Sequence, residues 1–113
     1  MKEVEFPFAI EEFFLKCKKH GHLPKNDFEK QAVLLVLLRE FKKGKVYNEG
    51  EVNEHIKLHF EDFATIRREL VNYGYLSRDP YKGEYKLVKD KLYVEDLEHH
   101  TLLKRHATPY LET

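Results

Sequence analysis

The chain has 113 residues, enough for one domain with a hydrophobic core but hardly for two. Apolar residues make up 42% and charged residues 35%, which excludes a disordered tail and indicates a soluble globular protein. Lysine plus arginine and aspartate plus glutamate number 20 each, so the formal net charge is zero. Since nucleic-acid binders usually carry a basic excess that neutralises phosphates, this balance argues against strong DNA binding outside a local patch.

The first expected helix covers residues 9–20, because apolar residues recur at helical spacing and Gly21 follows as a stop signal. A second helix is expected over residues 26–43, with a polar N-cap at its start. Lys42 and Lys43 fall in its last turn, where positive charge favours the helix dipole. The first half of the chain is therefore predicted to be helical.

Two shorter helices are expected next. The helix expected over residues 49–58 is preceded by Asn48, which together with Glu51 has the spacing of a capping box. Residues 62–73 begin with an aspartate N-cap and stop at Gly74, for which we expect a left-handed backbone conformation. Their closeness in the sequence predicts two helices joined by a short turn.

A β-hairpin is expected after these helices, joining residues 76–78 with residues 84–88 around a Pro-Tyr-Lys-Gly turn. One further helical stretch lies near residues 94–104. The predicted fold class is mainly α with a small β-hairpin: a winged-helix-like arrangement, a helix-turn-helix plus wing, with additions at both ends. The expected segments are an N-terminal helical extension (residues 1–22), a winged-helix-like domain (23–89) and a C-terminal helical tail (90–113).

The direction of two adjacent arginines bears directly on function. With successive helical residues about 100° apart, Arg67 falls inside the apolar arc of its helix, whereas Arg68 falls on the exposed face. A partly buried guanidinium needs a carboxylate partner, so we expect Arg67 to form a structural ion pair with a neighbouring helix. The candidate partner is Glu51, with Glu54 and Glu40 as alternatives.

The exposed face of the same helix carries Arg68 among three acids, Glu61, Asp62 and Glu69. A helix lying in the major groove would bring these carboxylates towards phosphates at a repulsive cost. The geometry therefore suits a helix-turn-helix, while the charge of its exposed face favours a surface that meets solvent or protein.

Any nucleic-acid contact is expected to come from the basic side chains around that face. These are Arg68, Arg78, Lys82 and Lys86, supported by Lys42 and Lys43. Such side chains can touch phosphates and position a duplex without reading its sequence. A charged surface is also often no more than a solvated face, and this alternative stays open.

Catalytic and metal-binding patterns are weak. His55 and His59 have the i, i+4 spacing of metalloprotease zinc ligands, but Ile56 stands where the catalytic glutamate belongs and no third ligand is evident. No phosphate loop, dinucleotide-binding glycine pattern or nucleophile elbow appears in the sequence. We therefore expect no enzyme, no metal and no cofactor.

Residues 23–87 resemble a bacterial family, domain of unknown function 2087. The matching pieces are Leu23-Pro24, the apolar helix that ends in Arg39-Glu40-Phe41, the block YNEGEVN, the block DFATIRRELVNYGYLSRD and the hairpin at residues 83–85. Members of that family occur alone or fused behind helix-turn-helix transcription regulators, so the resemblance implies a regulatory module without known catalysis. Members often have tryptophan after the hairpin tyrosine, whereas this chain has Lys86, which affects the packing or contacts of the wing.

The leading expectation is a non-catalytic, winged-helix-like module of transcription regulation with weak, electrostatic DNA binding. The alternative is a protein-interaction or dimerisation module of the same shape that does not read DNA. Residues 32–38 are apolar around the whole circumference of their helix, which favours a homodimer that covers them.

The lone Cys17 cannot form an intramolecular disulfide, which is typical of a reducing cytosol. The N-terminus begins with acidic and aromatic residues, unlike a secretory signal peptide, and residues 32–38 are too few to span a bilayer. We therefore expect a cytoplasmic protein without a membrane partner.

Overall fold

The computed structural model describes residues 1–111 and divides into two compact units. Among the described residues, the first unit combines both ends of the chain, residues 1–36 and 91–111, and the second consists of Leu37–Asp90. The boundaries of these units do not coincide with the expected segments 1–22, 23–89 and 90–113, because the two terminal segments fold together. That division into domains stays a prediction.

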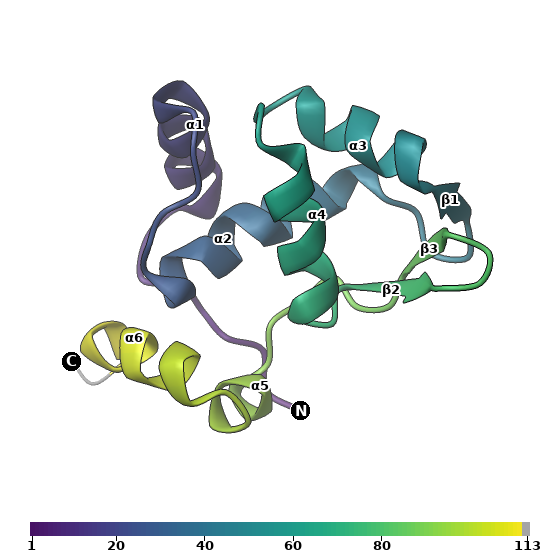
Figure 1. Ribbon diagram of the computed structural model, residues 1–113. Helices are drawn as coiled ribbons and strands as arrows, with labels where there is room; N and C mark the ends of the chain where they lie inside the picture. Colours follow the sequence, from purple (N-terminus) through teal and green to yellow (C-terminus); the bar gives the residue numbers. More distant parts are fainter. Residues whose placement is uncertain (112–113) are drawn as a thin grey trace. The chain divides into compact units, whose positions relative to one another are not determined.

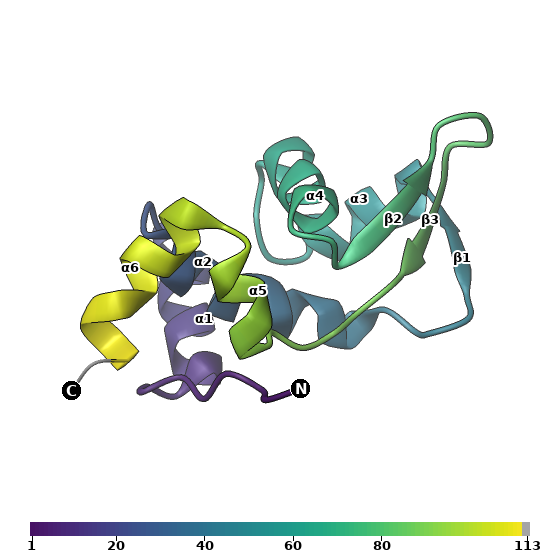
Figure 2. The same cartoon turned by 90° about the horizontal axis from the view of Figure 1, so that it is seen from below.

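Four helices make up most of the first unit (Figure 1): α1 (Ile10–His20), α2 (Asp27–Leu37), α5 (Val94–Glu98) and α6 (Thr101–Leu111). The amide of Val4 donates to the carbonyl of Leu92 at 2.8 Å, and the amide of Val94 donates to the carbonyl of Lys2 at 2.8 Å. These bonds hold the extended N-terminus against the segment that leads into α5, as both ribbon views show (Figures 1 and 2).

A cluster of aromatic rings joins the N-terminus, α2 and α6. Phe28, which is fully buried, stacks on Phe6 with ring centroids 4.9 Å apart and contacts Tyr110 at 5.4 Å. Phe8 contacts Tyr110 at 5.9 Å and Phe13 at 5.0 Å. The hydroxyl of Tyr110 donates a hydrogen bond to the carboxylate of Glu29 in α2, so the last helix is held by both apolar and polar contacts.

The second unit contains a short 3-10 helix, two α-helices and a small sheet. Its elements are η1 (Leu38–Glu40), β1 (Val46–Asn48), α3 (Glu49–Lys57), α4 (Phe63–Asn72), β2 (Leu76–Asp79) and β3 (Glu84–Leu87). The helices pack through Val52, Ile56, Ile66 and Leu70, which are buried to 2% exposure or less. The two predicted helices followed by a hairpin are confirmed.

The predicted caps explain where these helices begin. The Asn48 side chain accepts from the amide of Glu51 at 2.8 Å, and the Glu51 carboxylate accepts from the amide of Asn48 at 3.0 Å. This is the expected capping box. Asp62 accepts from the amide of Thr65 at 3.3 Å, and Gly74 has the expected left-handed conformation with φ 80°.

The sheet has three antiparallel strands in the order β1-β3-β2, so β3 is central. Tyr85 of β3 lies opposite Arg78 of β2 and opposite Tyr47 of β1. Directly opposed residues project to the same side of a sheet, so these three side chains share one face. The strand β1 was not expected from the sequence, and it extends the predicted hairpin into a sheet.

Two helix boundaries differ from the expectation. α2 ends at Leu37 rather than near residue 43, because the chain tightens into η1 and then becomes extended at Phe41, with ψ 137°. Lys42 and Lys43 therefore lie in a connecting segment rather than in a helical last turn. In the tail, two separate helices, α5 and α6, replace the single expected stretch over residues 94–104.

The apolar residues that favoured a homodimer are mostly covered within one chain. Ala32, Val33, Leu34, Leu37 and Leu38 are each 2% exposed or less. In the tail, Leu92 and Leu97 are also buried, while Leu102 is 44% exposed. These residues therefore need a second copy of the chain to cover them less than the sequence indicated, and the homodimer stays a prediction. Among the helices of residues 1–111, none is long and apolar enough to cross a membrane.

We predict that Tyr110→Phe lowers the stability of the first unit by about 1 kcal/mol at neutral pH, because it removes the hydrogen bond to Glu29. That bond, followed by burial, raises the pKa of Tyr110 above its ordinary value of 10.0. The bond therefore stabilises the fold below about pH 10 and is lost as pH rises through the raised pKa. Urea unfolding at neutral and alkaline pH should show the difference between wild type and variant shrinking as pH rises. A difference that stays constant with pH would contradict the assignment.

Candidate functional site: an arginine pocket beside the hairpin

Arg67 lies where its helical phase predicts, with its side chain only 16% exposed. Its Nη1 donates to the side-chain oxygen of Asn53 at 2.5 Å, and its Nε lies 3.6 Å from the carboxylate of Glu49. The ion-pair partner is thus Glu49 and not the predicted Glu51. The physical reason is the capping box, which turns the Glu51 carboxylate back to the amide of Asn48.

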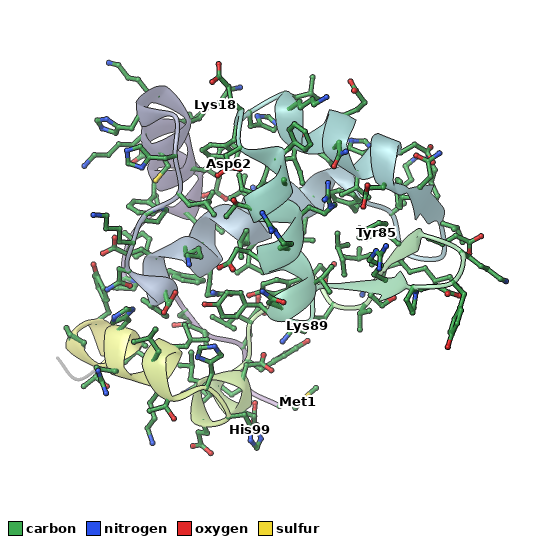
Figure 3. The ribbon with its side chains drawn as sticks, viewed as in Figure 1. Met1, Lys18, Asp62, Tyr85, Lys89 and His99 are labelled. Atoms are coloured by element: carbon green, nitrogen blue, oxygen red, sulfur yellow. The ribbon has the colours of Figure 1, made fainter. Side chains whose placement is uncertain are left out.

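Glu49 also accepts a hydrogen bond from the hydroxyl of Tyr85 at 3.0 Å, so one carboxylate joins the sheet to α3 and α4. Figure 3 shows Tyr85 between the sheet and the helices of this unit. Burial raises the pKa of Tyr85, and so does the bond to Glu49, while Arg67 and Arg78 lower it. The phenol therefore keeps its proton, and donates to the carboxylate, up to a higher pH than an ordinary tyrosine does.

A pocket of about 310 Å³ opens beside this network, and we call it the arginine pocket. It is lined by Glu49, Arg67, Arg68, Val71, Asn72, Arg78 and Tyr85. The α4 residues fall at i and i+4 spacing on one side of the helix, and Arg78 projects from β2 beside Tyr85. The pocket therefore collects three guanidinium groups around one carboxylate.

Of these arginines, Arg68 and Arg78 are the exposed ones. The Nε of Arg68 donates to the carbonyl of Ala64 in the same helix at 3.3 Å, which uses one of its five N–H donors. Arg67 is held by Asn53 and Glu49. The chemistry of the pocket is that of an anion site, because guanidinium groups bind phosphate or carboxylate oxygens in pairs.

A second, smaller pocket of about 210 Å³ lies along the hairpin, and we call it the hairpin pocket. It is lined by Ser77, Arg78, Asp79, Lys82, Glu84 and Lys86. Four of the six expected nucleic-acid contacts, Arg68, Arg78, Lys82 and Lys86, thus line one or the other pocket. Arg78 lines both.

Lys42 and Lys43 line neither pocket. The Lys42 amide donates to the Tyr47 hydroxyl at 2.8 Å, and the Lys43 ammonium lies 3.7 Å from the Asp90 carboxylate. Both side chains are exposed, and they lie on the segment that leads into β1.

Sequence reasoning missed Glu49, Asn72 and Tyr85 as parts of the site. The hairpin register was the available signal for Tyr85, since pairing strands around the turn places Tyr85 opposite Arg78. No comparable local signal marks Glu49, because its role depends on α3 and the sheet meeting in space.

The two histidines weighed as zinc ligands instead flank one carboxylate. The Nε2 of His59 lies 2.5 Å from Glu40 and the Nδ1 of His55 lies 3.5 Å from it. Across residues 1–111, no group of three or more histidine, cysteine, aspartate or glutamate side chains is arranged to hold a metal ion.

Residues 21–87 match the family described as an uncharacterized protein conserved in bacteria, DUF2087. The match covers more than half of the chain, so the chain belongs to this family. All residues that line the arginine pocket and the hairpin pocket lie inside the matched range. No curated protein and no solved structure matches the chain.

We predict that Arg67→Ala lowers stability more than Arg68→Ala, by about 1–2 kcal/mol. Arg67 is largely buried and holds Asn53 and Glu49, whereas Arg68 is exposed and bonds to its own helix. Since Glu49 is half exposed, the expected loss is smaller than for a fully buried pair. Urea unfolding midpoints measure the difference, and equal midpoints for the two variants would contradict a structural role of Arg67.

Proposed function

We propose that the chain is a non-catalytic, winged-helix-like regulatory module of bacterial transcription that contacts DNA phosphates weakly through the arginine pocket. The observation that carries the proposal is the meeting of Arg68 on α4 with Arg78 on β2 around that pocket. One arginine on a helix and one on the following hairpin can hold a phosphate between them. The site of action is proposed to be the cytoplasm.

The order of elements supports this proposal. α3 and α4 are joined by a short turn and followed directly by the β2–β3 hairpin, which is the order of a helix-turn-helix with a wing. The second helix of such a pair contacts nucleic acid, and the hairpin contacts it beside the helix. In this chain, α4 and β2 supply the exposed arginines at their shared edge.

The charge balance supports weak rather than strong binding. The arginine pocket has three arginines against the single carboxylate of Glu49, and the hairpin pocket has three basic side chains against Asp79 and Glu84. With a net charge of zero over the chain, few phosphates are neutralised and long-range attraction is small. Affinity should therefore depend on these local contacts and fall steeply with salt.

The alternative function, a protein-interaction or dimerisation module, is favoured by the opposite end of α4. Glu61 and Asp62 are both exposed at its start, where they would repel phosphates but suit a basic protein surface. A nucleic-acid ligand at the arginine pocket must avoid this end. A protein ligand can use it.

The test is a titration of mixed-sequence duplex DNA at increasing salt with the wild type, Arg68→Ala and Arg78→Ala. Each substitution should weaken binding and reduce the slope of log affinity against log salt by about one, because each removes one phosphate contact. Arg105→Ala is the matched control, since Arg105 is exposed on α6 in the other unit.

Unchanged slopes for Arg68→Ala and Arg78→Ala would refute the arginine pocket as the DNA contact. Absence of duplex binding by the wild type at low salt, together with a concentration-dependent mass in sedimentation, would favour the interaction module instead. Tight binding that hardly changes with salt would contradict the electrostatic character of the proposed contact.

A further inference from the structure

The hairpin ends in a loop that presents one aromatic ring to solvent. Tyr81 is 97% exposed, whereas Tyr47, Tyr75 and Tyr85 of the same unit are 2% exposed or less. Both ribbon views show this loop as the outer end of the hairpin, beyond the paired strands and away from α3 and α4 (Figures 1 and 2). A fully exposed large ring contributes nothing to the core.

The loop that carries Tyr81 is nevertheless well held. The Asp79 side chain accepts from the amide of Tyr81 at 2.9 Å and from the amide of Lys82 at 3.2 Å. The carbonyl of Asp79 accepts from the amide of Gly83 at 2.8 Å, and Gly83 is left-handed with φ 66°. These bonds fix the backbone on both sides of Tyr81, so a ligand that contacts the ring orders only the side chain.

The hairpin that carries the ring also carries basic side chains suited to a polyanion. Lys82 follows Tyr81 directly, and Arg78 and Lys86 lie on the two strands that the loop connects. All three are exposed and line the hairpin pocket. The acids there are Asp79, whose side chain is used by the turn, and Glu84.

The sequence neighbours of Tyr81 are not the residues that a lipid or a hydrophobic protein groove would need. Pro80, Lys82 and Gly83 are the neighbours of Tyr81, and none is a large apolar residue. Membrane surfaces and hydrophobic grooves are normally engaged by several apolar side chains together. A single aromatic ring among basic side chains is instead typical of nucleic-acid binding, where the ring stacks on a base and the cations contact phosphates.

We propose that Tyr81 stacks on an unpaired nucleobase while Arg78, Lys82 and Lys86 contact the flanking phosphates. The inference rests on the proposed nucleic-acid function and specifies its ligand. Base faces inside a duplex are covered by their neighbours, so a stacking ring selects single strands, ends or bulges. The chain should therefore prefer nucleic acid with unpaired bases over a blunt duplex with the same number of phosphates.

The chain has no tryptophan, so Tyr81→Trp in the full chain gives a single fluorescent reporter at the loop. A short oligothymidylate should quench it on binding, whereas inorganic polyphosphate of similar charge should bind through the basic residues with little quenching. In parallel, Tyr81→Ala should weaken oligothymidylate binding about ten-fold and leave polyphosphate binding unchanged. Tyr81→Phe should keep wild-type affinity, because stacking needs the ring and not the hydroxyl.

Equal affinity of wild type and Tyr81→Ala for oligothymidylate would overturn the inference while leaving the proposed phosphate contact intact. Equal losses for oligothymidylate and polyphosphate would also overturn it, because the ring would then act without stacking. Quenching by vesicles of phosphatidylglycerol but not by oligothymidylate would mean a lipid ligand and would overturn it too. If the wild type binds neither oligothymidylate nor duplex DNA at low salt, the proposed function fails together with this inference.

Discussion

The carboxylate of Glu49 in α3 accepts a hydrogen bond from the Tyr85 hydroxyl in β3 and forms an ion pair with Arg67 in α4. Three elements of the second unit are therefore joined by one charged group. Tyr85 lies on the central strand of the sheet, and a shift of β3 would move both neighbouring strands. The raised pKa of Tyr85 extends the alkaline range over which the phenol keeps its proton and donates to Glu49. The position of Arg78 relative to α4 follows from this bond, since Arg78 is paired with Tyr85 across the sheet. Glu49 also offsets the charge of Arg67, while Arg68 and Arg78 are the exposed arginines of the arginine pocket.

Two of the three acids on the exposed face of α4, Glu61 and Asp62, lie at the start of the helix, whereas Glu69 directly follows Arg68. Viewed down the axis, Arg68 falls among Glu61, Asp62 and Glu69, which argues against phosphate binding. Along the axis, Asp62 and Arg68 are about 9 Å apart, close to the screening length of physiological salt. Asp62 caps the N-terminus, where a negative charge is favoured by the helix dipole. Asp62 therefore has a structural reason for its place, and the arginine end, which also carries Glu69, can act separately from the helix start.

Much of the fold was predictable from local signals, because caps and turns are encoded within a few residues. Asn48 with Glu51, Asp62 and Gly74 mark the helix ends that the structure confirms. The strand β1 was not predictable, since it has three residues and its partners Glu84 to Lys86 lie far along the chain. Its last residue, Asn48, is also the N-cap of α3, so in the sequence this segment looks like the start of a helix and not like a strand.

The sequence predicted most of the basic residues that line the two pockets, but it did not predict which other residues they contact. The helical phase correctly separated Arg67, which is partly buried, from Arg68, which is exposed. The choice of Glu51 as partner was wrong for a reason already visible in the sequence: the capping box and the ion pair competed for the same carboxylate. Glu49 and Tyr85 could not be found this way, because their meeting requires the sheet and α3 to be placed in three dimensions.

The geometry of the hairpin determines how one ligand can reach both pockets. Arg78 shares the face of Tyr85, whereas Ser77 and Lys86 are paired on the opposite face, yet the Arg78 side chain lines both pockets. β2 is an edge strand in the order β1-β3-β2, so no further strand is paired with its outer edge. A strand of nucleic acid that contacts both pockets must therefore pass over the edge of β2 and meet Arg78 at the crossing. On such a path, α4 lies at one end and the loop with Tyr81 lies at the other, so phosphate contacts and base stacking would fall on successive parts of the same ligand.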